Sequence, residues 1–404
     1  MGLQPTSQRS VWRDRTLIIL SASLVAESLA LWGANGPLFA MLAMEWSGSP
    51  MGAGIILTMT VLPHVFLGPL TGGFLDRACR RNTLLFLNLT RAAVVLVLML
   101  FVGNAGMLYV ASLALAVSQL LGLVARGSLV PALVDRDQLQ ATNGMLNGAS
   151  TLGRVLGPAV MGAALDHGGP RYAYIAVAAP FLLASLMLLF VPRVRIPRSA
   201  EQFLRRTMDG VRHTFRTPLT RLLVLATVPF LVGGAMLNLL ELLLASDVLR
   251  AGATGYGAML SMWSCGSLVG ALGAAAVRRG GSFASFVAGA IAMGAFTGAL
   301  YWADNLPFAL AMMASGGVAE AFRSISATSL FQAWTPKEKL PHVLGVYAAV
   351  GAASMVFAYL VESAIVDFLG IRPAFLLAAA LVGGSALLAA ALGRGLPEGM
   401  AWPK

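Results

Sequence analysis

Twelve long apolar segments, separated by mostly short polar turns, run the length of this sequence and leave few folds open to it. A transmembrane helix needs roughly 20 consecutive apolar residues, and each segment is about that long or longer. The pattern predicts an all-α membrane protein with 12 transmembrane helices. The segments lie near residues 17–42, 52–75, 83–103, 106–128, 142–165, 172–192, 221–246, 255–277, 282–302, 306–330, 343–366 and 372–393.

The composition excludes a soluble protein. Only 11% of the 404 residues are charged and 58% are hydrophobic, whereas soluble domains carry about 25% charged residues. In water, this chain would have too few polar side chains to cover its surface. A net charge of +11 would suggest nucleic acid as the partner of a soluble protein. Here we expect a lipid bilayer and no nucleic acid.

Residues 193–220 form the only long polar segment within the chain, and this segment is rich in arginine. It divides the sequence into an N-terminal six-helix bundle (1–192), a basic linker and a C-terminal six-helix bundle (221–404). Of the 28 Lys and Arg residues, 21 fall on the same side of the membrane as the linker and three on the opposite side. Positive residues are retained in the cytoplasm, so we expect the linker and both termini to be cytoplasmic.

Two motifs carry a resemblance to a known family. The loop after the second segment reads GGFLDRACRR, and the fifth segment contains GRVLGPAVMG at 153–162. Together with the layout of six and six helices, they resemble the major facilitator superfamily. Its loop pattern, G-x-L-x-D-R-x-G-R-R, is matched at Gly72, Asp76, Arg77, Arg80 and Arg81. Phe74 and Cys79 stand where the pattern has Leu and Gly.

A third stretch, PALVDRDQLQATN at 131–143, is similar to the branch of the superfamily that contains enterobactin exporters and macrolide efflux proteins. The resemblance implies two pseudo-symmetric bundles that rock about a site near the middle of the membrane. It also implies a cytoplasmic latch, in which Asp76 lies at the N-terminus of the eleventh helix. Arg77 would pair with an acid at the end of the fourth helix, either Asp135 or Asp137. Arg80 and Arg81 belong to this latch or only anchor the topology.

The motif of the fifth segment resembles one found in proton-coupled antiporters. Its small residues allow close helix packing, and its proline can bend the helix. Either a bend that seals the transport path or ordinary packing explains the motif. Its members are Gly153, Gly157, Pro158 and Gly162.

Charged residues inside the membrane cost at least about 2.5–3.5 kcal/mol each and are candidates for function. Glu27 and Arg154 both fall near the membrane midplane. A Glu27 without a nearby cation could carry a proton or bind a cationic substrate, but beside Arg154 it would stay ionised. We favour Glu27 as the proton or substrate site, with a structural ion pair as the alternative.

Other intramembrane charges have simpler interpretations. Arg91 can extend toward the inner surface. Glu320 and Arg323 are spaced to pair on one helix face, in a structural or gating role. Glu241 and Glu362 fall near the outer helix ends, where we expect them to be solvated.

The sequence contains no zinc-protease motif, phosphate-binding loop or nucleophile elbow. We therefore expect no enzymatic activity, no metal and no cofactor. The leading hypothesis is a monomeric secondary transporter of a bacterial inner membrane, which exports a small amphipathic compound such as a drug or siderophore in exchange for protons. A lipid or lysophospholipid transporter is the alternative within transport. A receptor or scaffold is the alternative of another class, and the buried charges argue against it.

Overall fold

The structure is a computed structural model that describes residues 13–67, 79–135, 138–193, 216–275, 282–335 and 340–393. All elements within these ranges are helices. Nine of the described helices or helix runs are long and apolar enough to cross a membrane. The all-α membrane fold is therefore confirmed, and the order of the described helices fits the expected 12.

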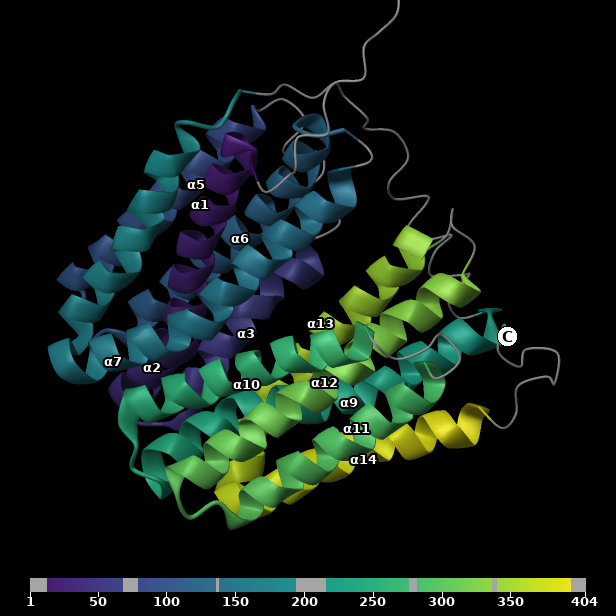
Figure 1. Ribbon diagram of the computed structural model, residues 1–404. Coiled ribbons are helices and arrows are strands. Elements are labelled where there is room, and N and C mark those ends of the chain that lie inside the picture. Colours follow the sequence, from purple (N-terminus) through teal and green to yellow (C-terminus); the bar gives the residue numbers. More distant parts are fainter. Residues whose placement is uncertain are drawn as a thin grey trace, which may run out of the picture.

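The helices form two groups, which we call the N-terminal and C-terminal halves (Figure 1). The N-terminal half contains α1 (Arg15–Gly33), η2 (Ala34–Leu38), α2 (Phe39–Ser47), α3 (Pro50–Phe66), α5 (Arg80–Val97), η4 (Leu98–Leu100), α6 (Ala105–Leu129), η5 (Val130–Ala132) and α7 (Leu139–Leu188). The C-terminal half contains α9 (Pro218–Leu243), η7 (Leu244–Val248), α10 (Gly252–Ala275), α11 (Ser282–Ala299), η9 (Leu300–Trp302), α12 (Leu306–Trp334), α13 (Leu340–Leu369) and α14 (Ile371–Gly393).

Some helices are longer or more continuous than the hydropathy pattern predicts. The first membrane helix comprises α1, η2 and α2, and the π-helix η2 lies where Pro37 interrupts the regular hydrogen bonding. α7 covers both the fifth and sixth predicted segments. Gly169 separates them with a φ of 68°, a conformation that a side chain would strain. The two parts of α7 therefore cross the membrane separately.

The two ends of the bundle differ in their connections. We call the end with tight described turns the turn side, and the end at which the described chain is interrupted the linker side. Several helices start at the turn side with a side-chain N-cap. The side chains of Ser49, Asn104 and Asn305 accept hydrogen bonds from the first backbone N–H groups of α3, α6 and α12. The charge distribution of the sequence predicts that the linker side is cytoplasmic.

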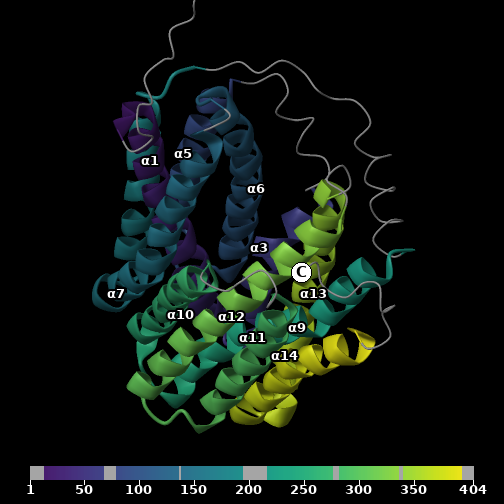
Figure 2. The same cartoon turned by 45° about the vertical axis from the view of Figure 1, so that its right-hand side comes forward.

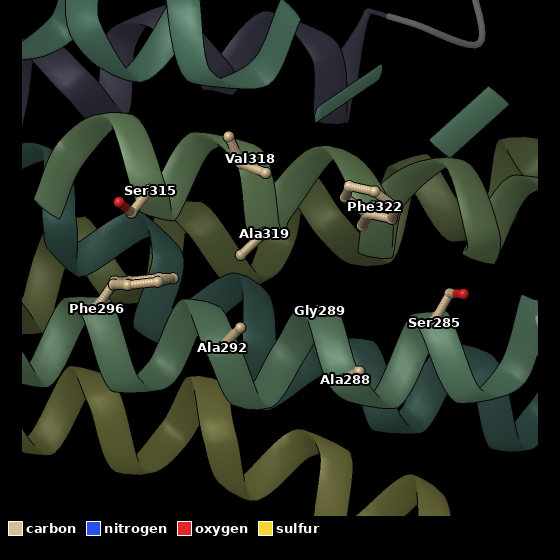
Figure 3. Close-up of a pocket in the computed structure, with 9 residues that line it drawn as sticks. All are labelled: Ser285, Ala288, Gly289, Ala292, Phe296, Ser315, Val318, Ala319 and Phe322. Carbon is tan, nitrogen blue, oxygen red and sulfur yellow. The ribbon is translucent and has the colours of Figure 1, made fainter. Parts of the chain in front are cut away.

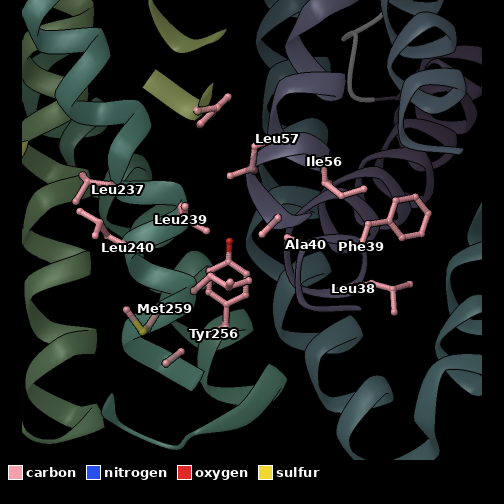
Figure 4. Close-up of a cluster of buried hydrophobic side chains, with 14 of the residues drawn as sticks. Leu38, Phe39, Ala40, Ile56, Leu57, Leu237, Leu239, Leu240, Tyr256 and Met259 are labelled. Atoms are coloured by element: carbon pink, nitrogen blue, oxygen red, sulfur yellow. The ribbon is translucent and has the colours of Figure 1, made fainter. Parts of the chain in front are cut away.

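The halves touch at the turn side and diverge toward the linker side, as both Figure 1 and Figure 2 show. We call their contact region the seam. It joins α7 to α10 and α3 to α13. One apolar cluster crosses it, and Figure 4 shows Ala40 and Leu57 of one half facing Leu239 and Tyr256 of the other.

Candidate functional site

A buried ion cluster occupies the middle of the N-terminal half. The Glu27 carboxylate on α1 binds two guanidinium groups: Arg91 Nη1 at 2.8 Å and Arg126 Nη2 at 2.7 Å. Arg91 is itself fully buried on α5 and donates further hydrogen bonds to Asn88 Oδ1 at 2.8 Å and to both the Oγ and the backbone oxygen of Ser118 at 2.7 Å. Almost every polar group in the cluster is therefore paired.

This geometry changes the interpretation of Glu27 and Arg91. The partners of Glu27 are Arg91 and Arg126, and the structure records no ion pair between Glu27 and Arg154. Arg91 does not extend to the surface, because Glu27 lies directly opposite it within the half. Two cations hold Glu27 in its ionised form, so the geometry agrees with the structural alternative. Nothing in the sequence pattern indicates that Arg126, which lies near the end of α6, belongs to the same cluster.

A second group of charges lies between the two halves. The Arg154 guanidinium on α7 stacks over the Trp32 ring of α1, 4.6 Å from its centroid. It also interacts electrostatically with Glu320 on α12, in the other half. Trp32 is 40% exposed at mid-helix, and Arg154 is exposed as well. An exposed arginine at this depth is tolerated where water reaches it, which assigns Trp32 and Arg154 to the opening between the halves.

The C-terminal half supplies the opposite wall of this site. Arg323 lies 3.9 Å from Glu320, so the predicted pairing of these two residues is confirmed. Its guanidinium also lies over the Phe230 ring, 3.6 Å from the centroid. Two of its nitrogens, Nε and Nη1, are buried without a hydrogen-bond partner among the described residues. Cation–π contacts of this kind contribute about 2 kcal/mol when desolvated. We call Trp32, Arg154, Glu320, Arg323 and Phe230 the central site.

The glycine motif of α7 contacts two different helices. Gly153 and Gly157 lie against α1, where an added Cβ at either position would overlap the backbone of Leu29. Pro158 and Gly162 instead face α10 across the seam, where Gly257 and Ala253 approach them closely. Half of the motif therefore packs the N-terminal half internally, and the other half holds the two halves together.

Polar contacts reinforce the seam near the motif. The Asp166 carboxylate on α7 accepts hydrogen bonds from the backbone N–H groups of Ala253 at 3.1 Å and Thr254 at 2.7 Å. These two groups begin α10, where unpaired N–H groups and the helix dipole favour an anion. Ser261 Oγ also accepts from the backbone N–H of Ala159 at 3.2 Å. Sequence reasoning missed Asp166, because an acid just before a turn looks like an ordinary surface residue.

Most of the predicted cytoplasmic latch falls outside the part of the chain that the structure describes: Gly72, Asp76, Arg77 and Asp137. Arg81 is described, and it donates to the backbone oxygens of Leu188 and Leu189 at the linker-side end of α7. Asp135 is exposed and makes no ion pair among the described residues. Arg80 is buried. The latch itself therefore stays a prediction.

The expectation that Glu241 and Glu362 are solvated is wrong. Their residues are 4% and 0% exposed, respectively, because α9 and α13 pack against each other in the C-terminal half and cover them. Both oxygens of Glu362 lack a hydrogen-bond partner among the described residues. Hydropathy reports how near a residue lies to a helix end, but not which neighbouring helix covers it.

A groove of about 470 Å³ lies between α11 and α12, within the C-terminal half (Figure 3). Phe296 and Phe322 flank it, small residues form most of its floor, and Ser285 and Ser315 are its polar residues. No charged residue lines it. It is therefore separate from the central site.

Comparison with known proteins agrees with this architecture. The family model for the Major Facilitator Superfamily matches residues 20–283. The chain belongs to this superfamily. It is a multi-pass membrane protein.

Its curated relatives are distant. It is 25% identical over 197 residues to YvqJ of Bacillus subtilis (strain 168), an uncharacterized MFS-type transporter, a match that covers 48% of this chain and 46% of that protein. The chain thus aligns with about half the length of this relative. It is also 25% identical over 382 residues to Tap of Mycolicibacterium fortuitum, a multidrug efflux pump, which covers 90% of this chain and 92% of Tap.

Solved structures show the same fold. The nucleoside transporter NupG superposes with a TM-score of 0.73 at 14% identity, over 94% of this chain and 98% of NupG. The human organic anion transporter MFSD10 gives a TM-score of 0.64 at 18% identity, over 93% of this chain and 99% of MFSD10. At such identities the likeness extends to the fold alone.

Proposed function

We propose that this chain is a secondary active transporter that exports a small amphipathic compound in exchange for protons. The observation that carries the proposal is the central site, in which Trp32 and Arg154 of one half face Glu320 of the other. A site shared by two halves changes its access when the halves rock, which is the basis of alternating access. The polar and aromatic side chains suit a compound with both apolar and charged parts.

Export is supported by two lines of argument. The alignment with the multidrug efflux pump Tap extends over most of both chains. The motifs of the sequence are similar to those of the branch with enterobactin exporters and macrolide efflux proteins.

We place the chain as a monomer in a bacterial inner membrane with both termini in the cytoplasm. Because it has no phosphate-binding loop, an ion gradient is the proposed energy source.

The charges around the central site favour a substrate with an acidic group. Arg91, Arg126, Arg154 and Arg323 face only two nearby carboxylates, Glu27 and Glu320, which leaves two positive charges in excess. Arg91 and Arg126 both bind Glu27 within the N-terminal half, whereas Arg154 is exposed and interacts with Glu320 of the other half. A carboxylate or acidic phenol on the substrate would balance this excess.

The test is transport by the purified chain in proteoliposomes with an imposed pH gradient, screened with siderophores, macrolides and lysolipids. We expect gradient-driven transport of at least one compound, and an acid to be transported better than its methyl ester. Arg154→Gln should raise KM about tenfold, equivalent to about 1.4 kcal/mol, without changing the protein yield. The matched control is Arg216→Gln, which removes an exposed arginine next to α9.

Three outcomes would contradict the proposal. Transport that does not depend on the gradient would eliminate proton exchange. A preference for lysolipids over every soluble compound would favour the lipid transporter. Binding of a compound without transport would favour a receptor. An ester that is transported as well as its acid would contradict only the acidic-group inference.

A further inference from the structure

The Arg323 guanidinium on α12 carries hydrogen-bond donors that no described residue uses. Arg323 is buried, and its Nε and Nη1 atoms have no hydrogen-bond partner among the described residues. Buried Arg91, by contrast, donates through Nε, Nη1 and Nη2. An unsatisfied buried donor is costly, and most buried polar atoms in proteins have a partner. The donors of Arg323 are therefore available to an acceptor that enters the central site.

Aromatic rings contact this guanidinium without using its N–H groups. Its carbon lies 3.6 Å from the centroid of the Phe230 ring on α9 and 5.8 Å from that of the Phe286 ring on α11. Such contacts are made through the ring faces and the charge of the cation. The N–H groups point outward in the plane of the guanidinium, where a carboxylate can accept two parallel hydrogen bonds. A carboxylate is thus the group that fits the unused donors best.

Glu320 lies at the nitrogen that both donor edges of Arg323 share. One edge of a guanidinium presents Nε with Nη2, and the other presents Nη1 with Nη2. Glu320 Oε1 is 3.9 Å from Nη2, which is too long for a hydrogen bond. Glu320 therefore attracts the cation without satisfying its donors, and it stands where a carboxylate on either edge would bind.

Glu320 is also the member of this pair that can move. Its side chain is 29% exposed, whereas that of Arg323 is 3% exposed. A second cation is near it, because Arg154 of the other half interacts electrostatically with Glu320. The group thus has two arginines and one acid. If an anion enters, Glu320 can turn toward Arg154, and each arginine then keeps one negative partner.

We propose that Arg323 binds the carboxylate of an organic acid, and that Glu320 occupies its place until this acid displaces it toward Arg154. No covalent bond changes in this exchange. The inference rests on the proposed function, since it assigns the acidic group of the substrate to one residue of the central site. It also gives Glu320 a role in specificity, because a neutral compound offers Arg323 no negative charge in exchange for the one it would displace.

The experiment measures the binding of radiolabelled benzoate to the purified full chain in lipid nanodiscs at neutral pH. Benzoate supplies a carboxylate on a small ring, and methyl benzoate has the same ring without the charge. We expect unlabelled benzoate to compete with the label and methyl benzoate not to compete. Glu320→Gln keeps the size of the side chain but removes the competing charge, so the Kd for benzoate should fall about tenfold.

Double variants identify the cation that benefits from this change. In an Arg323→Gln background, Glu320→Gln should change the Kd by less than about twofold, or neither variant should bind detectably. In an Arg154→Gln background, Glu320→Gln should still lower the Kd about tenfold. If Arg323→Gln does not fold, Arg323→Lys replaces it. This variant keeps the charge but loses the planar fork, and it should bind benzoate at least about fivefold more weakly than Arg323 in the Glu320→Gln background.

The matched control is Asp367→Asn, which removes an exposed acid from α13 in the same half and should leave the Kd unchanged. An affinity gain in Glu320→Gln that persists without Arg323, or that disappears without Arg154, would overturn the inference. It would also be overturned by an unchanged Kd in Glu320→Gln, by Arg323→Lys binding as tightly as Arg323, or by no benzoate binding in either the parent or Glu320→Gln.

Transport separates this inference from the proposed function. If the variants bind benzoate as expected but the parent shows no gradient-driven transport of any compound, the proposed function fails and the carboxylate site stands. If the parent transports an acidic compound under a pH gradient but Glu320→Gln does not tighten benzoate binding, the assignment of Arg323 and Glu320 fails and the proposed function stands.

Discussion

At the scale of single residues, the partners of each charge decide its role. Glu27 and Glu362 are both buried acids on membrane helices, yet one contacts two arginines and the other contacts no cation among the described residues. The sequence identified Glu27, Arg91, Arg154, Glu320 and Arg323 as unusual, because each interrupts an apolar segment. It paired Glu320 with Arg323 but did not identify the partners of Glu27, because residues 60 to 100 positions apart in the chain meet only after the helices pack.

Glu27→Gln tests the structural role of the buried cluster. The substitution leaves the guanidinium groups of Arg91 and Arg126 without their counter-charge, and loss of one partner from a buried pair costs about 3–5 kcal/mol. We expect a clear fall in folded yield and in the midpoint of thermal unfolding, measured on the purified protein in detergent. Glu45→Gln, at an exposed position on α2, should behave like the parent. A stable Glu27→Gln protein that loses only proton coupling would return Glu27 to the proton-carrying role.

At the scale of helices, the order of the described helices and the break within α7 follow closely from the sequence. Apolar length predicts the membrane helices, and Gly169 with its neighbours marks the turn between the fifth and sixth. The division into residues 1–192, 193–220 and 221–404 stays a prediction, since most of the middle segment lies outside the described ranges. The motif of the fifth helix predicted close packing, but its glycines could not reveal that two of four positions face the other half.

Asp166→Asn tests the contact between α7 and the start of α10. A carboxylate at a helix N-terminus stabilises its contact by about 0.3–1 kcal/mol, and by up to about 2 kcal/mol in favourable geometry. The neutral amide keeps the size of the side chain but loses the charge. The measurement is the distance between spin labels at Met51→Cys on α3 and Phe368→Cys on α13, which lie on either side of the seam. We expect the fraction of molecules with a closed seam to fall about two- to tenfold relative to the fraction with an open seam.

Asp247→Asn is the control for this prediction, because Asp247 is an exposed acid on the same side of the membrane as Asp166. An unchanged seam distance in Asp166→Asn would mean that the hydrogen bonds to Ala253 and Thr254 do not hold the halves together.

At the scale of the whole molecule, two halves meet along the turn-side seam and present one central site between them. The layout of six and six helices indicates this architecture from sequence, since the superfamily resemblance covers most of the chain. The direction in which the site opens depends on small differences between the contacts at the two ends. Residues such as Asp166 and Ser261 make those contacts in three dimensions, which hydropathy does not resolve.

The most direct test of the whole account records two distances under the same conditions. One pair of labels spans the seam, at Met51→Cys and Phe368→Cys, and a second pair, in a separate variant, spans the linker side at the exposed positions Asn82→Cys and Gln332→Cys. Rocking of rigid halves predicts opposite changes: when Asp166→Asn lengthens the seam distance in a fraction of the molecules, the linker-side distance shortens in a similar fraction. Distances that lengthen together, or a linker-side distance that stays fixed while the seam opens, would contradict alternating access.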